Sequence, residues 1–295
     1  MTERPYGSYH GLYINLDRSP ERRHNIEMQL AEFGLQDRYA RFPAVDGKLV
    51  DVPNSTLKAG EVGVFLSHHH ALEQTRELGK CIHVIEDDAL LSRHVSTVIE
   101  GAIAAKLFES YDLLFTDSVV NCHLGLIKNL KNAFDGIKIP ESGLLRFGDL
   151  KLMNLAQIFF ASFSSYIVGA KSIARVLGLY EQEIANGPTI PVDIFIQQQV
   201  LAGKLRAACV FPFITSARIE EIVNSTIADQ GERAGKTSLI VMAVLGYSFF
   251  VGRDLEYAKK ILDEATSVRR TKPDMHDRLI SQVTAFMLSN DFEGL

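Results

Sequence analysis

Cysteine and excess basic charge are both scarce in this sequence. Only Cys81, Cys122 and Cys209 occur among the 295 residues, and they form no CxxC pair. An odd and dispersed set of this kind indicates reduced thiols, so we expect a cytoplasmic protein. Lys and Arg number 31 against 36 Asp and Glu, which gives a net charge of −5 without a basic stripe. This balance argues against a nucleic acid as the main partner.

Long apolar runs are also missing. The longest, from Ser238 to Val251, has 14 residues, which is too few for a helix that crosses a bilayer. It lacks a polar face, which favours a buried core or interface helix over a helix lying on a membrane surface. The segment Met1–Leu16 shows no basic region followed by an apolar one, so we expect no signal peptide.

The sequence does contain a regular alternation of strand-like and helix-like segments. Its hydrophobic content of 46% is that of a globular protein. Short apolar runs predict strands at 11–16, 41–45, 81–85, 111–117 and 205–213, and the segment 164–180 predicts a strand followed by a helix. Helical spacing of apolar residues predicts helices over 20–33, 61–78, 95–107 and from about 193 onward. Strands alternating with helices indicate an α/β fold.

Two regions depart from this alternation. The segment 121–154 is the least regular, and we expect either a long active-site loop or a small subdomain there. Beyond about residue 231 the pattern is helical only, with helices predicted at 239–251, 255–267 and 274–288. We therefore divide the chain into an α/β domain, residues 1–231, and a helical C-terminal extension, residues 232–295.

Acidic side chains follow two of the predicted strands. Glu86, Asp87 and Asp88 come directly after the strand at 81–85, and Asp117 ends the strand at 111–117. Ligands of open α/β sheets bind beyond the carboxyl ends of the strands. Side chains alternate in direction after a strand, so Glu86 and Asp88 can face one side and bind a divalent cation through oxygen. A solvated acidic turn is the alternative.

Four motifs occur in order within 80 residues. They are YINLDRSPERR (Tyr13–Arg23), FPAVDGK (Phe42–Lys48), GEVGVFLSHHHAL (Gly60–Leu72) and IHVIEDDA (Ile82–Ala89). Together they resemble glycosyltransferase family 25, which includes bacterial lipooligosaccharide glycosyltransferases and the collagen galactosyltransferases. Looser likenesses extend the resemblance over residues 10–228. Val64 departs from the pattern, because that family has a cysteine at the corresponding position.

The resemblance implies a GT-A-like, Rossmann-type nucleotide-sugar-binding domain. It implies a UDP-sugar donor, often UDP-galactose, inversion at the anomeric carbon, and a glycan acceptor such as lipooligosaccharide or lipopolysaccharide. On this interpretation Asp88, assisted by Glu86 or Asp87, holds Mn²⁺ or Mg²⁺ against the donor diphosphate. We expect Asp193 to be the catalytic base. Asp193 could instead be an ordinary acid of a first helical turn.

Further site residues follow from the motifs. Asp117 is the second choice for the base, since it could instead hold the sugar. Arg22 lies at a helix start, where a guanidinium can meet a phosphate. We expect the donor to be bound by Asn15, Asp17, Arg22, Ser67, His68, Glu86 and Asp87.

Two other functions use the same residues. One is Mg²⁺-dependent hydrolysis of a phosphoryl group, and the other is a catalytically degenerate binding or scaffold protein. The extension 232–295 has no counterpart in the family pattern. We expect it to serve either homodimerisation or docking at the inner face of a membrane.

Overall fold

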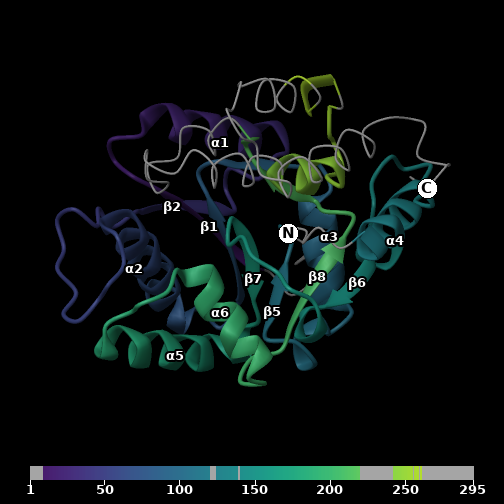
Figure 1. Cartoon of the computed structure of the whole chain (residues 1–295). Helices are drawn as coiled ribbons and strands as arrows, with labels where there is room; N and C mark the ends of the chain where they lie inside the picture. Colours follow the sequence, from purple (N-terminus) through teal and green to yellow (C-terminus); the bar gives the residue numbers. More distant parts are fainter. Residues whose placement is uncertain are drawn as a thin grey trace, which may run out of the picture.

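A central β-sheet with helices on both faces forms the body of the molecule (Figure 1). The computed structural model of the chain describes residues 9–119, 124–138, 140–219, 242–254, 256–258 and 260. The expected α/β class is confirmed, and the arrangement is that of a Rossmann-like fold. Among the described residues, no helix has the length and apolar character needed to cross a membrane.

The main sheet has seven strands. In spatial order they are β2 (Tyr39–Pro43), β1 (Tyr9–Asn15), β3 (Cys81–Glu86), β7 (Ser165–Val168), β5 (Leu113–Phe115), β8 (Ala207–Phe211) and β6 (Lys151–Asn154). β7 and β6 run antiparallel to their neighbours, and the other five strands share one direction. Their carboxyl ends therefore lie along one edge. A separate pair joins β4 (Ala89–Leu91) to β9 (Thr215–Ala217).

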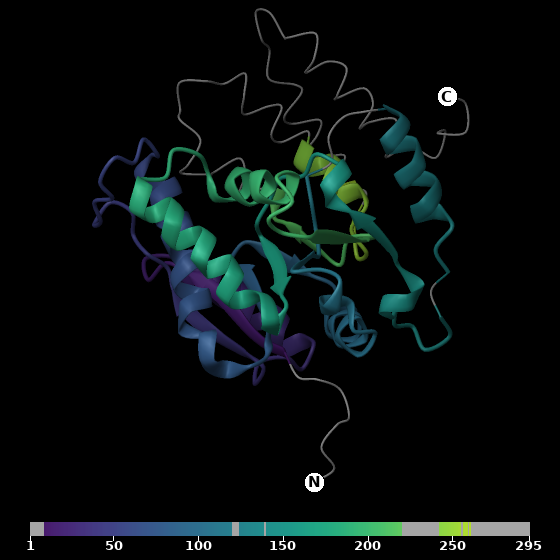
Figure 2. The same ribbon diagram turned by 90° about the horizontal axis from the view of Figure 1, so that it is seen from below.

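Helices pack on the two faces of this sheet. One face carries α2 (Ala59–Gln74), α4 (Leu124–Asp135), α5 (Ile173–Asn186) and α6 (Val192–Leu201). The opposite face carries α1 (Pro20–Glu32) and α3 (Val95–Ala104). Figure 2 shows α5, in green, alongside α2, in blue.

Alternation along the strands divides the buried side chains between two cores. In β3, Ile82 and Val84 belong to the core under α2, whereas Cys81 and Ile85 belong to the core under α1 and α3. Both faces of the strands are thus covered. This explains why the strands read as continuous apolar runs in the sequence.

The irregular segment 121–154 contains more structure than its sequence suggests. Described residues there include α4 and β6, so the segment supplies one helix and one edge strand of the main sheet. The sequence did not predict α4 and β6, because the glycines and Pro140 of this segment are residues that usually mark turns and loops.

The beginning of the predicted extension packs against the α/β body. Residues 242–248 are helical, which agrees with the helix predicted at 239–251. Leu245 and Phe249 lie in the core under α2, and Phe250 forms a bridge with Phe213 just beyond β8. The helix predicted at 255–267 is described only at 256–258 and 260, which are helical. The helix predicted at 274–288 lies outside the described residues, and the boundary at 231 stays a prediction.

Candidate functional site

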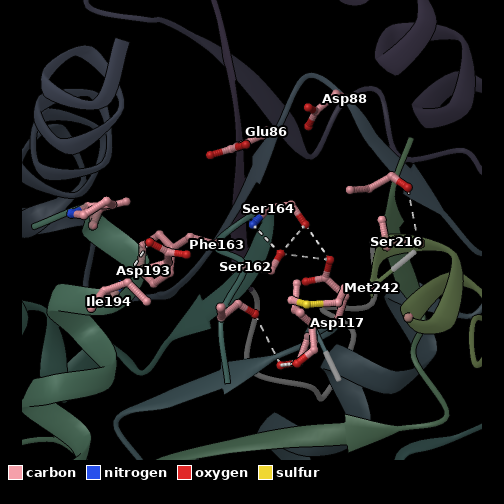
Figure 3. A pocket seen from close by; sticks show the side chains of 18 of the residues that line it. Glu86, Asp88, Asp117, Ser162, Phe163, Ser164, Asp193, Ile194, Ser216 and Met242 are labelled. Carbon is pink, nitrogen blue, oxygen red and sulfur yellow. Dashed lines mark hydrogen bonds between the residues drawn. The ribbon is translucent and has the colours of Figure 1, made fainter. Parts of the chain in front are cut away.

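A cavity of about 600 Å³ opens at the edge where the parallel strands end. Glu86 ends β3, Asp117 follows β5, and both line the cavity. β7 runs in the opposite direction, so the residues just before it, 161–164, reach the same edge. The start of α6 and residues 242–247 complete the wall (Figure 3). The cavity therefore occupies the position at which open α/β sheets bind ligands.

The three consecutive acids at the end of β3 point in two directions. Glu86 and Asp88 line the cavity, as the alternation of side chains predicts. Asp87 is not among the lining residues and is 8% exposed. Its carboxylate accepts a hydrogen bond from Asn15 Nδ2 at 2.7 Å and lies 3.4 Å from Arg22 Nη1. Burial raises the pKa of Asp87, while these two partners lower it.

The residues expected to hold the donor form a polar network behind Asp87. Arg41 donates to Asn15 Oδ1 at 3.0 Å and to Asp17 Oδ1 at 2.5 Å. Arg22 lies 4.0 Å from the Asp88 carboxylate, which connects this network to the cavity. Asn15, Asp17 and Arg22 do not line the cavity themselves. Their contact with a donor stays a prediction.

Ser67 joins two of the sequence motifs. Its hydroxyl accepts a hydrogen bond from Val45 N at 2.8 Å and donates one to Gly63 O at 2.6 Å. A Cβ on Gly63 would lie 2.7 Å from Val45 O, and one on Gly47 would lie 1.7 Å from Ala59 O. The glycines of both motifs thus permit α2 to approach the turn after β2. Packing therefore explains why each of the two motifs contains a glycine at this contact.

His68 connects α2 to the cavity. The imidazole is 1% exposed, with Nε2 3.1 Å from Glu86 Oε1 and Nδ1 3.1 Å from the hydroxyl of Tyr166 in β7. Each ring nitrogen therefore has one partner, which fixes the ring in place. Because the ring is held from behind, His68 orients the carboxylate of Glu86 within the cavity.

Asp117 is a buried carboxylate at the cavity wall. Ser164 donates a hydrogen bond to its Oδ2 at 2.5 Å, and the Ser162 hydroxyl lies 3.4 Å from the same atom. Oδ1 is buried without a hydrogen-bond partner among the described residues. Burial, aided by the negative charge of Glu86, raises the pKa of Asp117 to about 7, and the bond from Ser164 acts in the opposite direction. The free oxygen can accept a hydrogen bond from a hydroxyl group of a bound ligand.

Asp193 lies at the first turn of α6, on another wall of the same cavity (Figure 3). Its Oδ1 accepts a hydrogen bond from Ile194 N at 2.9 Å. Burial raises the pKa of Asp193, and the backbone amides of Ile194 and Ser162 lower it. Ser162 thus contacts both acids, and it does so with a φ of +84°, a conformation that non-glycine residues rarely adopt.

The carboxylates of the cavity supply some, but not all, of the ligands of a divalent cation. Among the described residues, no group of three or more His, Cys, Asp or Glu side chains lies close enough together to hold a metal ion. Mg²⁺, however, is commonly bound by one or two carboxylates together with water and phosphate oxygens. Glu86 and Asp88, which line the same cavity, supply two carboxylates of the kind that such a cation uses.

Several lining residues were not identified from the sequence. Ser162 and Ser164 carry no motif, although polar residues just before a buried strand are a signal for a sheet-edge site. Tyr166, which contacts His68, is fully buried in β7 and does not line the cavity itself. The apolar part of the wall joins residues that are far apart in the chain, including Phe159, Phe163, Phe213, Met242 and Tyr247.

Comparison with known proteins supports the family resemblance. A family model described as Glycosyltransferase family 25 (LPS biosynthesis protein) matches residues 9–196. A curated Glycosyltransferase 25 family member from Drosophila pseudoobscura pseudoobscura is 29% identical over 126 residues, which cover 36% of this chain and 20% of that protein. One from Aedes aegypti is 31% identical over 132 residues, which cover 37% and 21% respectively. The matches thus span about a fifth of these relatives' length.

Proposed function

The chain belongs to glycosyltransferase family 25, and we propose that it transfers a hexose, such as galactose, from a UDP-sugar to a hydroxyl group of a glycan. The observation that supports this proposal is the cavity itself. Glu86, Asp88, Asp117 and Asp193 line one space at the carboxyl edge of the sheet. A fifth lining acid, Glu61, accepts a hydrogen bond from Lys58 N at the start of α2. Such a set can serve both a nucleotide diphosphate and an acceptor hydroxyl.

The donor half of the site is built from Glu86 and Asp88. We propose that they hold Mn²⁺ or Mg²⁺, which supplies Lewis-acid stabilisation of the charge on the departing diphosphate. His68 keeps the Glu86 carboxylate in place through the 3.1 Å contact. Arg22, close to both Asp87 and Asp88, offers a guanidinium to the phosphates.

The acceptor half of the site contains Asp193 and Asp117. The acceptor oxygen forms the new bond to the anomeric carbon while the bond to UDP breaks, and a carboxylate takes the hydroxyl proton. We assign this base to Asp193, whose pKa is raised by burial, so that it binds a proton more readily than an exposed aspartate. Asp117 Oδ1 then accepts a hydrogen bond from a sugar hydroxyl. A single displacement of this kind inverts the anomeric configuration.

The acceptor that fits this proposal is a cell-surface glycan or glycolipid. The matching family model carries the description LPS biosynthesis protein, which supports an acceptor of the lipopolysaccharide type. Such a reaction would take place in the cytoplasm, at the inner face of the membrane. We propose a GT-A-like binding mode for the nucleotide, in which Glu86 and Asp88 would hold a cation that neutralises charge on the diphosphate.

Calorimetric titration with UDP tests the donor site. We expect binding in the presence of Mn²⁺, loss of binding with excess EDTA, and at least a tenfold weaker affinity in Asp88→Asn. The matched control is Asp135→Asn, because Asp135 is an exposed acid at the end of α4, outside the cavity lining. Absence of UDP binding to the wild-type protein in both conditions would refute the proposal.

Turnover then identifies the reaction. We expect slow release of UDP from one UDP-sugar of a panel, faster release with a glycan acceptor, and loss of the acceptor-dependent rate in Asp193→Asn. Metal-dependent release of inorganic phosphate without a sugar acceptor would instead identify a phosphoryl hydrolase. UDP binding without turnover of any sugar would favour a binding protein.

A further inference from the structure

The wall formed by residues 242–247 is the least expected part of the cavity. Met242, Ala243, Gly246 and Tyr247 line the space, and their spacing places them on one face of a helix. These residues lie beyond the segment 9–196 that matches the family model. The wall therefore lies outside the part of the chain that the family model matches.

Packing holds this helix firmly against the body. Leu245 and Phe249 are fully buried in the main core, and Phe250 bridges to Phe213. Gly246 comes close to the segment after β5, since a Cβ there would lie 3.4 Å from Ser118 O. Because Leu245 and Phe249 are buried in the core, the other face of the helix is turned towards the cavity.

The surface that this helix presents is apolar. The Tyr247 hydroxyl accepts a hydrogen bond from Asp254 N at 2.9 Å, so the polar end of this lining residue has a partner. Met242 projects into the cavity on the same side as Asp117 (Figure 3). Phe213 continues this surface, and Phe159, which is 46% exposed, lies at the cavity wall as well.

A sugar hydroxyl placed against this surface would lose its bonds to water without gaining others, which is unfavourable. An alkyl group placed there gains free energy from burial. Asp193 and Glu86 lie on other parts of the cavity wall than Met242 (Figure 3), and they offer the hydrogen bonds that a sugar requires. The cavity thus matches a molecule with a hydroxylated end and an apolar end.

We propose that residues 242–247 form an acceptor-selecting wall, which binds an alkyl or acyl chain attached to the acceptor sugar. The inference rests on the proposed transferase function and specifies its acceptor as a glycolipid-like molecule. The chain contacts Met242 and Tyr247 while a sugar hydroxyl faces the acids. A glycan without an apolar group binds more weakly.

Binding of simple glycosides tests this wall directly. The probes are octyl and methyl β-D-galactopyranoside, and octyl and methyl β-D-glucopyranoside, each below its micelle concentration. Burial of one methylene group is worth roughly a factor of four in affinity, so two or three buried groups give roughly a 15- to 60-fold preference for the octyl form. We expect this preference in the wild-type protein, measured by ligand-observed NMR.

Two variants assign the preference to the wall. Met242→Gln places a polar group on it, and Ala243→Leu fills the space beside it. Each should reduce the octyl-to-methyl ratio at least fivefold, while UDP binding stays unchanged. Met28→Gln is the matched control, because Met28 is an exposed methionine on α1, 57% accessible and outside the cavity lining. It should leave the ratio as it is.

The outcomes separate this inference from the proposed function. Equal binding of octyl and methyl glycosides, or an octyl-to-methyl ratio that neither variant changes, would overturn the inference that residues 242–247 bind an alkyl chain. Neither result would affect the UDP titration. Failure of UDP to bind would overturn the transferase function, whatever the glycosides do. A phenyl glycoside serves as a further arm, and a preference confined to it would overturn the assignment to an alkyl chain.

Discussion

Replacing Asp117 by asparagine should stabilise the protein at neutral and alkaline pH. The buried carboxylate has its pKa raised to about 7 from an ordinary value of 3.8. The folded state therefore retains a proton that the unfolded chain releases, and stability falls as the pH rises from about 4 to about 7. The amide of the substituted side chain carries no charge at any pH, so the variant avoids this loss.

The size of the effect follows from the shift in pKa. A difference of about three pKa units corresponds to about 4 kcal/mol, since each unit is worth about 1.4 kcal/mol. The gap in unfolding free energy between Asp117→Asn and the wild type should be small at pH 4. It should widen by up to about 1.4 kcal/mol per pH unit and become constant above about pH 7.

Urea denaturation from pH 4 to pH 9 measures this gap. EDTA is present throughout, so that no bound cation neutralises the carboxylate. Asp135→Asn is the control, because an exposed acid in an ion pair contributes less than about 1 kcal/mol. Parallel stability curves for the wild type and Asp117→Asn would show that burial does not perturb the pKa of this carboxylate, and would refute the reasoning. Acceptor-dependent turnover should be lost in Asp117→Asn even where its stability is higher.

Three further changes test the scaffold around the site, each followed by urea denaturation. Burial lowers the pKa of His83 to about 3. As the pH falls from 6.5 towards 3, the free energy of unfolding should therefore fall by up to about 1.4 kcal/mol per pH unit, and His83→Gln should flatten that slope. An unchanged slope would contradict this. Ser162→Gly should relieve a positive φ worth about 1 kcal/mol, whereas Ser162→Ala should not, so equal stabilities of the two variants would argue against strain. Gly63→Ala should cost about 1–3 kcal/mol through its close contact with Val45 O, whereas Gly178→Ala, with open space around it, should be neutral or stabilising.

Local patterns in the sequence were sufficient to predict the first part of the site. The strand before Glu86 is a continuous apolar run, and the alternation of side chains places Glu86 and Asp88 together without further information. Asp193 could be placed at a helix start from its neighbours alone. These features depend on short-range rules, which a sequence records directly.

The rest of the site depends on which strands are neighbours. β7 lies between β3 and β5 and runs against both, and this brings Ser162 and Ser164 to the acids. Periodicity gives the existence of a strand but neither its direction nor its position in the sheet. The same limit applies to Met242. It lines the same cavity as Asp117, but the two residues are far apart in the chain, so the sequence does not predict that they lie together.

The packing of Leu245 and Phe249 also determines when the main core can be completed. Both side chains are fully buried among residues contributed by the sheet and its helices. A chain emerging from the ribosome at about 5–20 residues per second finishes β9 at least about a second before Phe249 is synthesised. Until then the apolar surface that later faces Phe249 stays open to solvent. The α/β body is therefore completed by a segment that arrives late, and a chain cut at residue 231 would have to fold without it.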